Sequence, residues 1–193
     1  MENTIFLSII TVCKNCAATI EPCISSVVRE LEPDMEYLII DGLSKDRTVE
    51  IAKGLTDTVE NVHIYSDPDN GIYEAMNKGL RLSHGKYVYF LNSDDWLLPG
   101  SLHKMTDILK AHPEIDCLYG DVRTSTVPGV TNPWVYKAKP RPETILKDMA
   151  FCHQGVICSR EKMLALGGFD TSFQISSDRD LMIRLYKSGA KFQ

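Results

Sequence analysis

Residues 87–95 read Tyr-Val-Tyr-Phe-Leu-Asn-Ser-Asp-Asp, an apolar run that ends in two adjacent carboxylates. A short apolar run bounded by polar residues predicts a strand that is buried on both faces. Two neighbouring carboxylates at the end of such a strand repel each other and resist burial without a compensating cation. Because hard oxygen ligands favour magnesium or manganese, Asp94 and Asp95 are candidate ligands of Mg²⁺ or Mn²⁺. The alternative is a solvated loop that happens to carry two acids.

Two apolar runs upstream end in polar clusters of the same kind. Residues 8–12 (Ser-Ile-Ile-Thr-Val) lead to Asn15, and residues 39–40 lead to Asp41 and Asp46. In an open parallel sheet, ligands bind outside the carboxyl ends of the strands. We therefore expect these clusters to converge with the two aspartates in one binding site.

Strands and helices alternate over the first hundred residues, which predicts a parallel α/β sheet. The expected strands cover residues 5–12, 37–40, 62–65 and 87–91. The expected helices cover residues 17–31, 49–55 and 72–82, and Gly85 is expected to stop the third helix.

The second half of the chain does not continue this alternation of strands and helices. Its apolar periodicity, prolines and glycines predict helices over residues 101–111, 160–166 and 177–187 and a strand over 117–119. Residues 121–142 are expected to be irregular or antiparallel. Residues 190–193 resemble the start of a further strand that is cut short, so we expect the chain to be truncated at its C-terminus.

Size and charge restrict the class of protein. A chain of 193 residues is expected to form one domain. The net charge of −5 and the absence of any basic run argue against a nucleic-acid partner. No apolar stretch reaches the length of a transmembrane helix, and the N-terminus lacks the layout of a signal peptide. We expect a cytoplasmic protein, for which contact with a membrane surface stays open.

Six cysteines need an explanation. Cys13 and Cys16 have the spacing of a redox or zinc motif, but no second pair with that spacing completes a zinc site. Such a site would need Cys152, His153 or Cys158 to fold back onto the first pair. We expect buried, reduced cysteines instead.

Taken together, the motifs resemble those of family-2 glycosyltransferases with the GT-A fold, of the colanic-acid type in polysaccharide biosynthesis. The matching segments are residues 8–12 with Asn15, 40–42 with Ser44 and Asp46, 69–79, 90–95, 167–170 and 178–181. The resemblance covers nearly the whole chain. It implies one GT-A domain over residues 1–193, with a Rossmann-like, mainly parallel sheet flanked by helices. Residues 1–98 would bind the nucleotide sugar, and residues 99–193 would form an irregular acceptor-side half.

The resemblance also implies roles for single residues. The nucleotide pocket would contain Thr11, Val12, Asn15, Asp41, Asp46, Asn77, Lys78, Gly79 and Asp94. Asp41 matches the acid that hydrogen-bonds the base, which suits the N–H of a uracil or thymine ring. Asp94 would approach the ribose or the metal, and Asp95 would coordinate Mn²⁺ or Mg²⁺.

The acceptor side has its own candidates. Asp178 matches the general base that takes the proton of the acceptor hydroxyl. The family often has Glu-Asp at this place, whereas Ser177 precedes the aspartate here, so the first carboxylate is absent. Asp180 is the rival base, although its place inside the helix suits a structural role. His153 and Gln154 resemble a polar pair on the acceptor side of related enzymes, and the alternative for His153 is a core histidine.

The expected function is metal-dependent, inverting transfer of a sugar from a UDP- or dTDP-sugar to a hydroxyl of a glycan or lipid-linked acceptor. The expected location is the cytoplasm, and contact with the inner face of the membrane stays open. A non-catalytic nucleotide-sugar-binding module is the alternative from another class, and it would not need the base. A nucleotidyltransferase usually has a glycine-rich loop after its first strand, and residues 11–15 contain no glycine.

Overall fold

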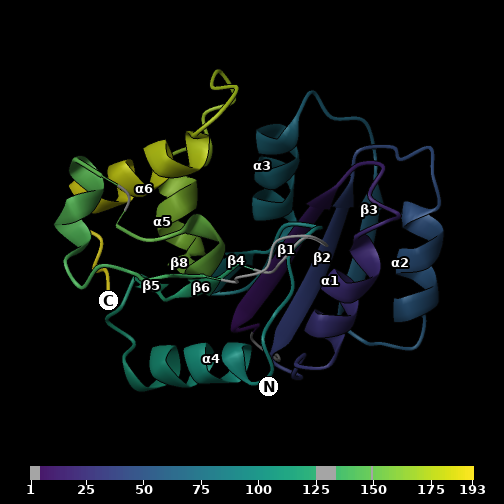
Figure 1. The fold of residues 1–193 in the computed structure, drawn as a ribbon, viewed down its shortest axis with the longest axis horizontal. Helices are drawn as coiled ribbons and strands as arrows, with labels where there is room; N and C mark the ends of the chain where they lie inside the picture. Colours follow the sequence, from purple (N-terminus) through teal and green to yellow (C-terminus); the bar gives the residue numbers. More distant parts are fainter. Residues whose placement is uncertain (1–4, 125–133, 149) are drawn as a thin grey trace.

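The structure, a computed structural model, describes residues 5–124, 134–148 and 150–193 and contains a six-stranded sheet flanked by helices (Figure 1). The strands follow the order β3-β2-β1-β4-β8-β5. Their bounds are β1 Leu7–Cys13, β2 Met35–Asp41, β3 Val62–Ser66, β4 Tyr87–Phe90, β5 Cys117–Tyr119 and β8 Val156–Ser159. Strands β1 to β4 are parallel, and β8 runs antiparallel to both β4 and β5. The predicted, mainly parallel α/β sheet is confirmed.

Helices cover both faces of this sheet. Their bounds are α1 Ile20–Val28, α2 Thr48–Thr56, α3 Ile72–Leu82, α4 Ser101–Ala111, α5 Arg160–Ala165 and α6 Ser177–Lys187, with 3-10 turns η1 Pro142–Leu146 and η2 His153–Gly155. The predicted bounds of α3, α4 and α6 are confirmed. The first helix is shorter than predicted, because a turn in which Cys16 O accepts from the N–H of Thr19 and Ile20 precedes it.

The described part of the stretch 121–142 contains a short antiparallel pair, β6 (Val122–Arg123) with β7 (Val135–Tyr136), as predicted. Residues 125–133 of that stretch lie outside the described residues. The strand predicted at the end of the chain is present as a single bridge between Phe192 and Cys117.

Two features of the sheet differ from the prediction. Strand β8 was not predicted, because its four residues run directly into α5 without an intervening turn signal. Gly85 is not the helix stop, since α3 ends at the extended residue Ser83. A Cβ atom at Gly85 would lie 2.6 Å from the backbone nitrogen of Ser8, so glycine allows the chain to pass close to β1.

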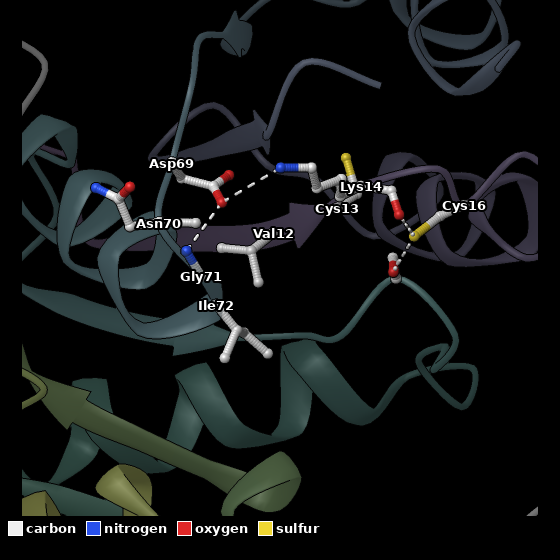
Figure 2. Close-up of a pocket in the computed structure, with 10 residues that line it drawn as sticks. Val12, Cys13, Lys14, Cys16, Asp69, Asn70, Gly71 and Ile72 are labelled. Carbon is white, nitrogen blue, oxygen red and sulfur yellow. Dashed lines mark hydrogen bonds and ion pairs between the residues drawn. The ribbon is translucent and has the colours of Figure 1, made fainter. Parts of the chain in front are cut away.

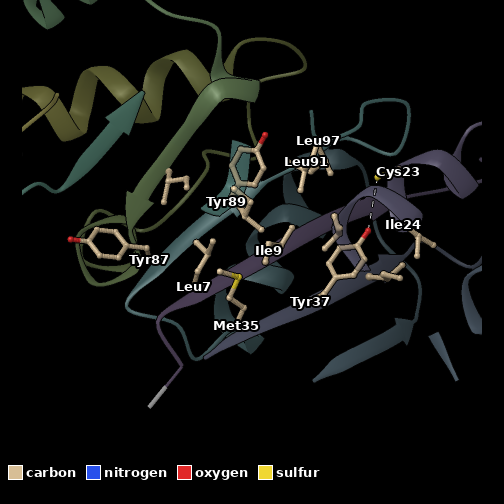
Figure 3. Packing of buried hydrophobic residues seen from close by; sticks show 14 of the residues in the cluster. Leu7, Ile9, Cys23, Ile24, Met35, Tyr37, Tyr87, Tyr89, Leu91 and Leu97 are labelled. Atoms are coloured by element: carbon tan, nitrogen blue, oxygen red, sulfur yellow. Dashed lines mark hydrogen bonds between the residues drawn. The ribbon is translucent and has the colours of Figure 1, made fainter. Parts of the chain in front are cut away.

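The central strand β1 separates two apolar cores. Alternate residues of a strand point to opposite faces. Leu7 and Ile9 therefore pack with α1, α2 and α4 in the core shown in Figure 3, whereas Ile10 and Val12 pack with α3, α5 and α6. All seven residues of β1 are buried, which confirms the prediction of a strand buried on both faces.

The six cysteines are free thiols. Cys13, Cys23, Cys117 and Cys158 are buried, as predicted, whereas Cys16 and Cys152 are half-buried. Over the described ranges, no group of three or more His, Cys, Asp or Glu side chains is arranged to hold a metal ion. This arrangement gives no support to the zinc alternative.

Across the ranges that the structure describes, no helix combines the length and the apolar character that crossing a membrane requires.

Gly79 is required where α3 lies on the sheet. A Cβ atom there would come within 2.5 Å of Ile10 and 3.2 Å of Ile40. We expect Gly79→Ala to lower the free energy of unfolding by about 1–3 kcal/mol through overpacking. The matched control is Gly54→Ala on α2, where a Cβ atom meets nothing within 4 Å. That substitution is expected to raise stability by about 0.5–1 kcal/mol. Urea denaturation of both variants measures the two effects, and equal effects would contradict the close packing of α3.

Candidate active site

A cavity of about 480 Å³ opens at the carboxyl end of β1 (Figure 2). Its lining comes from the end of β1, the loop and first turn of α3, and the loop after β4, namely Val12, Cys13, Lys14, Cys16, Asp69, Asn70, Gly71, Ile72, Ala75 and Ser93. The Ser93 hydroxyl, beside Asp94, lies 3.1 Å from the Cys16 sulfur and so joins the loops after β4 and β1. The loops after β1 and β4 therefore meet at this edge of the sheet. That the polar clusters at the strand ends form one binding site stays a prediction.

Hydrogen bonds join the loops after β1 and β2. The Asn15 N–H donates to Ser44 Oγ over 2.7 Å, and the Asn15 side-chain oxygen accepts from the N–H of Lys45. Asp46 accepts from the Thr48 side chain and from the N–H of Ala17, and these bonds hold the pKa of its carboxyl below the ordinary value. Asn15 and Asp46, both predicted nucleotide residues, therefore shape the loops beside the cavity without lining it.

Asp41 ends β2 and is 1% exposed. Its carboxylate accepts hydrogen bonds from the N–H and hydroxyl of Ser44 and, over 2.6 Å, from the hydroxyl of Ser66. The Cys13 sulfur lies 3.8 Å away, and burial together with the charge of Asp41 raises the pKa of that thiol. Asp41 thus lies directly behind Cys13, a residue of the cavity wall, and holds the loop that follows β2.

We expect Asp41→Ala to lower the free energy of unfolding by about 2–4 kcal/mol, because three hydrogen bonds to one buried carboxylate are lost. The matched control is Asp67→Ala, which removes an acid whose side chain is 60% exposed and paired with Lys78. An exposed ion pair is worth at most about 1 kcal/mol. Thermal or urea denaturation compares the two variants. A loss for Asp41→Ala no larger than for the control would show that the Asp41 network does not stabilise the loop.

Four other predicted nucleotide residues do not line the cavity. Thr11 is fully buried, and its hydroxyl lies 2.9 Å from that of Tyr37 in the core. Asn77 accepts from the N–H of Phe169 and donates to its carbonyl over 2.8 and 2.7 Å. Lys78 pairs with Asp67, outside the cavity lining, and Gly79 packs on β1 and β2. Among the residues predicted for the nucleotide pocket, Val12 is in the lining and Asp94 adjoins Ser93.

The lining also contains an ion pair that the sequence did not indicate. Lys14 Nζ lies 3.8 Å from Asp69 Oδ1, and Asp69 accepts from the N–H of Gly71 over 3.1 Å (Figure 2). A Cβ atom at residue 42 would lie 2.1 Å from Asp69 Oδ2, so Gly42 is required beside this carboxylate. Lys14 is half exposed, and it brings a positive charge to the cavity. The sequence signal that could have indicated Asp69 as a site residue was the run Asp-Pro-Asp-Asn-Gly at residues 67–71, which directly precedes α3.

Asp94 and Asp95 follow β4 on the loop that carries Ser93. Burial raises the pKa of Asp95, the charge of Asp94 raises it further, and His153 acts in the opposite direction. A carboxylate whose charge is disfavoured by burial and by an adjacent acid is one that a bound cation would stabilise. Mg²⁺ is usually held by one or two carboxylates together with substrate phosphates, and does not need a cage of protein ligands. The two residues therefore fit the predicted divalent cation.

Asp178 lies in the first turn of α6, opposite η2 and α3. Its Oδ2 is 2.8 Å from His153 Nδ1, and its Oδ1 is 3.5 Å from the hydroxyl of Tyr73. Burial acts to raise the pKa of Asp178. The hydrogen bond and the charge of His153, together with the backbone N–H groups of residues 178 and 179, outweigh burial and hold the pKa below the ordinary value. The carboxylate is therefore ionised at neutral pH and can accept a proton.

The other acceptor-side candidates differ in their surroundings. Asp180 accepts from Arg184 Nε over 2.7 Å, so it has the structural partner that suits its helix position. The His153 side chain is 32% exposed and faces Asp178, so it is not a core histidine. The Gln154 carbonyl accepts from the hydroxyl of Tyr89, and its side chain bonds with its neighbour Cys152.

The sequence profile of the Glycosyl transferase family 2 matches residues 8–166. The chain belongs to this family and is an enzyme of it. The match includes the ends of β1, β2 and β4 and the turn that carries His153. The predicted family is thereby confirmed.

A relative supports the family assignment, and solved structures support the fold. The PGL/p-HBAD biosynthesis glycosyltransferase of Mycobacterium bovis is 30% identical over 185 residues, which are 95% of this chain and 70% of the relative. TarS of S. aureus in complex with UDP-GlcNAc has a TM-score of 0.76 at 17% identity over 94% of this chain. Mannosyltransferase PcManGT from Pyrobaculum calidifontis, in complex with GDP-Man and Mn²⁺, has a TM-score of 0.73 at 19% identity over 96% of this chain.

This chain spans 53% of each of these two solved chains. The structural likeness confirms the predicted GT-A fold.

Proposed function

We propose that this protein is an inverting glycosyltransferase that moves a sugar from a UDP- or dTDP-sugar to a hydroxyl of a glycan or lipid-linked acceptor, with Mg²⁺ or Mn²⁺ bound. The observation that carries this proposal is the position of the first turn of α3. Gly71 and Ile72 line the cavity, while the adjacent Tyr73 contacts Asp178. The candidate donor pocket and the candidate base therefore meet at one turn of helix.

The chemistry of the cavity supports a nucleotide-sugar donor. Its volume of about 480 Å³ lies in the range of small-molecule sites. Lys14 offers a positive charge for an anionic donor, and Asp41 holds the loop on which we place the base of the nucleotide. The nucleotide sugars in the complexes of TarS and PcManGT support this class of ligand.

Asp94 and Asp95 would hold the divalent cation. When bound, the cation supplies positive charge that offsets the negative charge of the diphosphate leaving group. The mutual repulsion of the two carboxylates supports this assignment, as does the Mn²⁺ in the PcManGT complex.

Transfer requires one displacement. The acceptor hydroxyl attacks the anomeric carbon, a new carbon–oxygen bond forms, and the bond to the diphosphate oxygen breaks with its electron pair on the nucleotide. Asp178 takes the hydroxyl proton late in this step, when the attacking oxygen has become acidic, so an ionised carboxylate of low pKa suffices. Attack from the face opposite the leaving group inverts the anomeric configuration. A non-catalytic binding module would not need an ionised carboxylate in contact with Tyr73, the residue after Ile72 of the cavity lining.

We place the reaction in polysaccharide biosynthesis of the colanic-acid type, in the cytoplasm at the inner face of the membrane. The name of the M. bovis relative, which refers to PGL/p-HBAD biosynthesis, supports a biosynthetic role. Trp96 and Leu98 lie within three residues of Asp95 on the chain. Their exposed fractions of 43% and 45% support peripheral contact with a membrane or an apolar acceptor.

A thermal-shift screen of nucleotide sugars tests this function, because a ligand that binds the folded state raises its apparent stability. We expect UDP- or dTDP-sugars with Mn²⁺ to raise the melting temperature, and the same sugars with EDTA to have little effect. The selected donor is then incubated with glycan and lipid-linked acceptors, and release of the nucleotide is measured. If the whole protein binds the donor but releases no nucleotide with any of the acceptors, the result would favour the non-catalytic binding module.

A further inference from the structure

His153 is held rigidly where it meets Asp178. Its 3-10 turn η2 is fixed to the sheet because the Gln154 carbonyl accepts from the hydroxyl of Tyr89 on β4 over 2.7 Å. Gly155 O also accepts from the N–H of Gly120 over 3.0 Å. A Cβ atom at Gly155 would lie 2.8 Å from a side-chain atom of Val122, so the turn sits tightly on its neighbours. The imidazole is thus presented from a fixed piece of backbone.

The hydrogen bond between His153 and Asp178 has a defined direction. An ionised carboxylate can only accept, so the proton lies on His153 Nδ1. The distance of 2.8 Å is that of a strong, charge-assisted bond. It occupies Oδ2 of Asp178, whereas Oδ1 has only the long 3.5 Å contact with Tyr73 among the side chains that the structure describes around it.

Backbone N–H groups also act on this carboxylate. Asp178 lies in the first turn of α6, where backbone N–H groups lack helical acceptors, and the N–H groups of residues 178 and 179 already act on its carboxylate. Short polar side chains near a helix start readily bond to such N–H groups. His153 adds a second hold on the same carboxylate, and the two together limit how it can turn.

We propose that His153 is a positioning residue for transfer, which fixes the orientation of Asp178 and leaves Oδ1 for the proton of the acceptor hydroxyl. This inference rests on the proposed function. It assigns His153 no contact with the reacting atoms. Its effect is to keep the base in the one orientation from which it reaches the acceptor.

The expected result is a lower kcat without a change in donor binding. His153→Ala is expected to lower kcat by about 10–100-fold, because a misplaced catalytic group costs on the order of 10²-fold in rate. The KM for the donor should stay within about twofold of wild type, since the cavity keeps its lining. His153→Asn places an amide N–H near the position of Nδ1 and should recover most of the lost rate.

The matched control is His84→Ala. His84 Nδ1 lies 3.2 Å from Glu36 Oε2, so it forms a pair of the same kind, next to Ser8 at the opposite end of the strands. Its removal is expected to change stability and to leave kcat at the wild-type value. In the Asp178→Asn background, His153→Ala should cause no further loss, because the group that it orients no longer accepts a proton.

Steady-state kinetics of these variants, made in the whole protein, tests the positioning role of His153. If Asp178→Asn lowers kcat and His153→Ala does not, the positioning role is refuted and the proposed function stands. A loss in His153→Ala as large as in Asp178→Asn, without recovery in His153→Asn, would make His153 itself the proton acceptor and overturn the inference. Absence of transfer by the wild-type protein would refute both the inference and the function.

Discussion

Replacement of Asp178 by Asn is expected to lower kcat for sugar transfer by about 10²–10⁴-fold while the affinity for the donor stays near wild type. Asparagine keeps the shape of the side chain but does not accept the hydroxyl proton. The structure supports this expectation because Asp178 is ionised beside His153 and contacts Tyr73 next to the cavity. Nucleotide release measures kcat, and titration calorimetry with the donor measures affinity.

The control for this substitution is Asp180→Asn, two residues along the same helix. Asp180 accepts from Arg184, whose guanidinium also donates to the carbonyls of Leu166 and Gly168. Its loss is expected to lower the free energy of unfolding by about 1–2 kcal/mol and to change kcat only slightly. The reverse pattern, with transfer lost in Asp180→Asn and kept in Asp178→Asn, would make Asp180 the base.

The pH dependence of transfer follows from the same carboxylate. The base is active when it is ionised, so kcat should fall as the pH drops through the pKa of Asp178 in the enzyme. Because His153 holds that pKa below the ordinary value, the acidic limb should lie below about pH 4, the usual range of an aspartate. It should move upward in His153→Ala, where burial is no longer opposed by the imidazole.

Removal of the divalent cation is expected to have the second large effect. Without a cation, the charges of Asp94 and Asp95 repel the phosphates of the nucleotide. We expect EDTA to weaken UDP binding by about 10²-fold, since a bound cation is worth several kcal/mol to a phosphate ligand. Transfer should stop at the same time. Calorimetric titration with UDP, first with Mn²⁺ and then with EDTA, measures the difference.

Two variants sharpen this test. Asp95→Asn should reproduce the effect of EDTA in the presence of Mn²⁺, because one of the two ligands loses its charge. Asp170→Asn is the control: this exposed carboxylate accepts from the N–H and side chain of Ser172, and its replacement should leave UDP affinity unchanged. Equal UDP affinity with Mn²⁺ and with EDTA would refute the role of a divalent cation in nucleotide binding.

The sequence was sufficient for the parts of the fold that depend on local pattern. The apolar run of β1 predicted a strand buried on both faces, and the alternation of strands and helices predicted α3 between Ile72 and Leu82. Strand β8 was missed because its four residues form a strand only by pairing with β4 and β5, which lie far away in the chain. A short strand that joins two distant partners has no period of its own.

The same limit applies to the site. Motif order predicted which loops meet, but not which side chains turn into the cavity. Thr11 lies on the face of β1 that packs against α1, and Asn77 is held by the backbone of Phe169, 92 residues away. The Lys14–Asp69 pair and the His153–Asp178 pair likewise join loops that only the folded sheet brings together. Such contacts become visible only when the register of the sheet is known.

The anomeric configuration of the first-formed product tests the central claim most directly, namely that one displacement assisted by Asp178 transfers the sugar. Proton NMR reads this configuration from the coupling constant of the anomeric proton of the transferred sugar, whose glycosidic bond prevents mutarotation. A single displacement predicts a product of opposite configuration to the donor. A product with the configuration of the donor cannot arise from one displacement on the face opposite the leaving group, and would contradict the account.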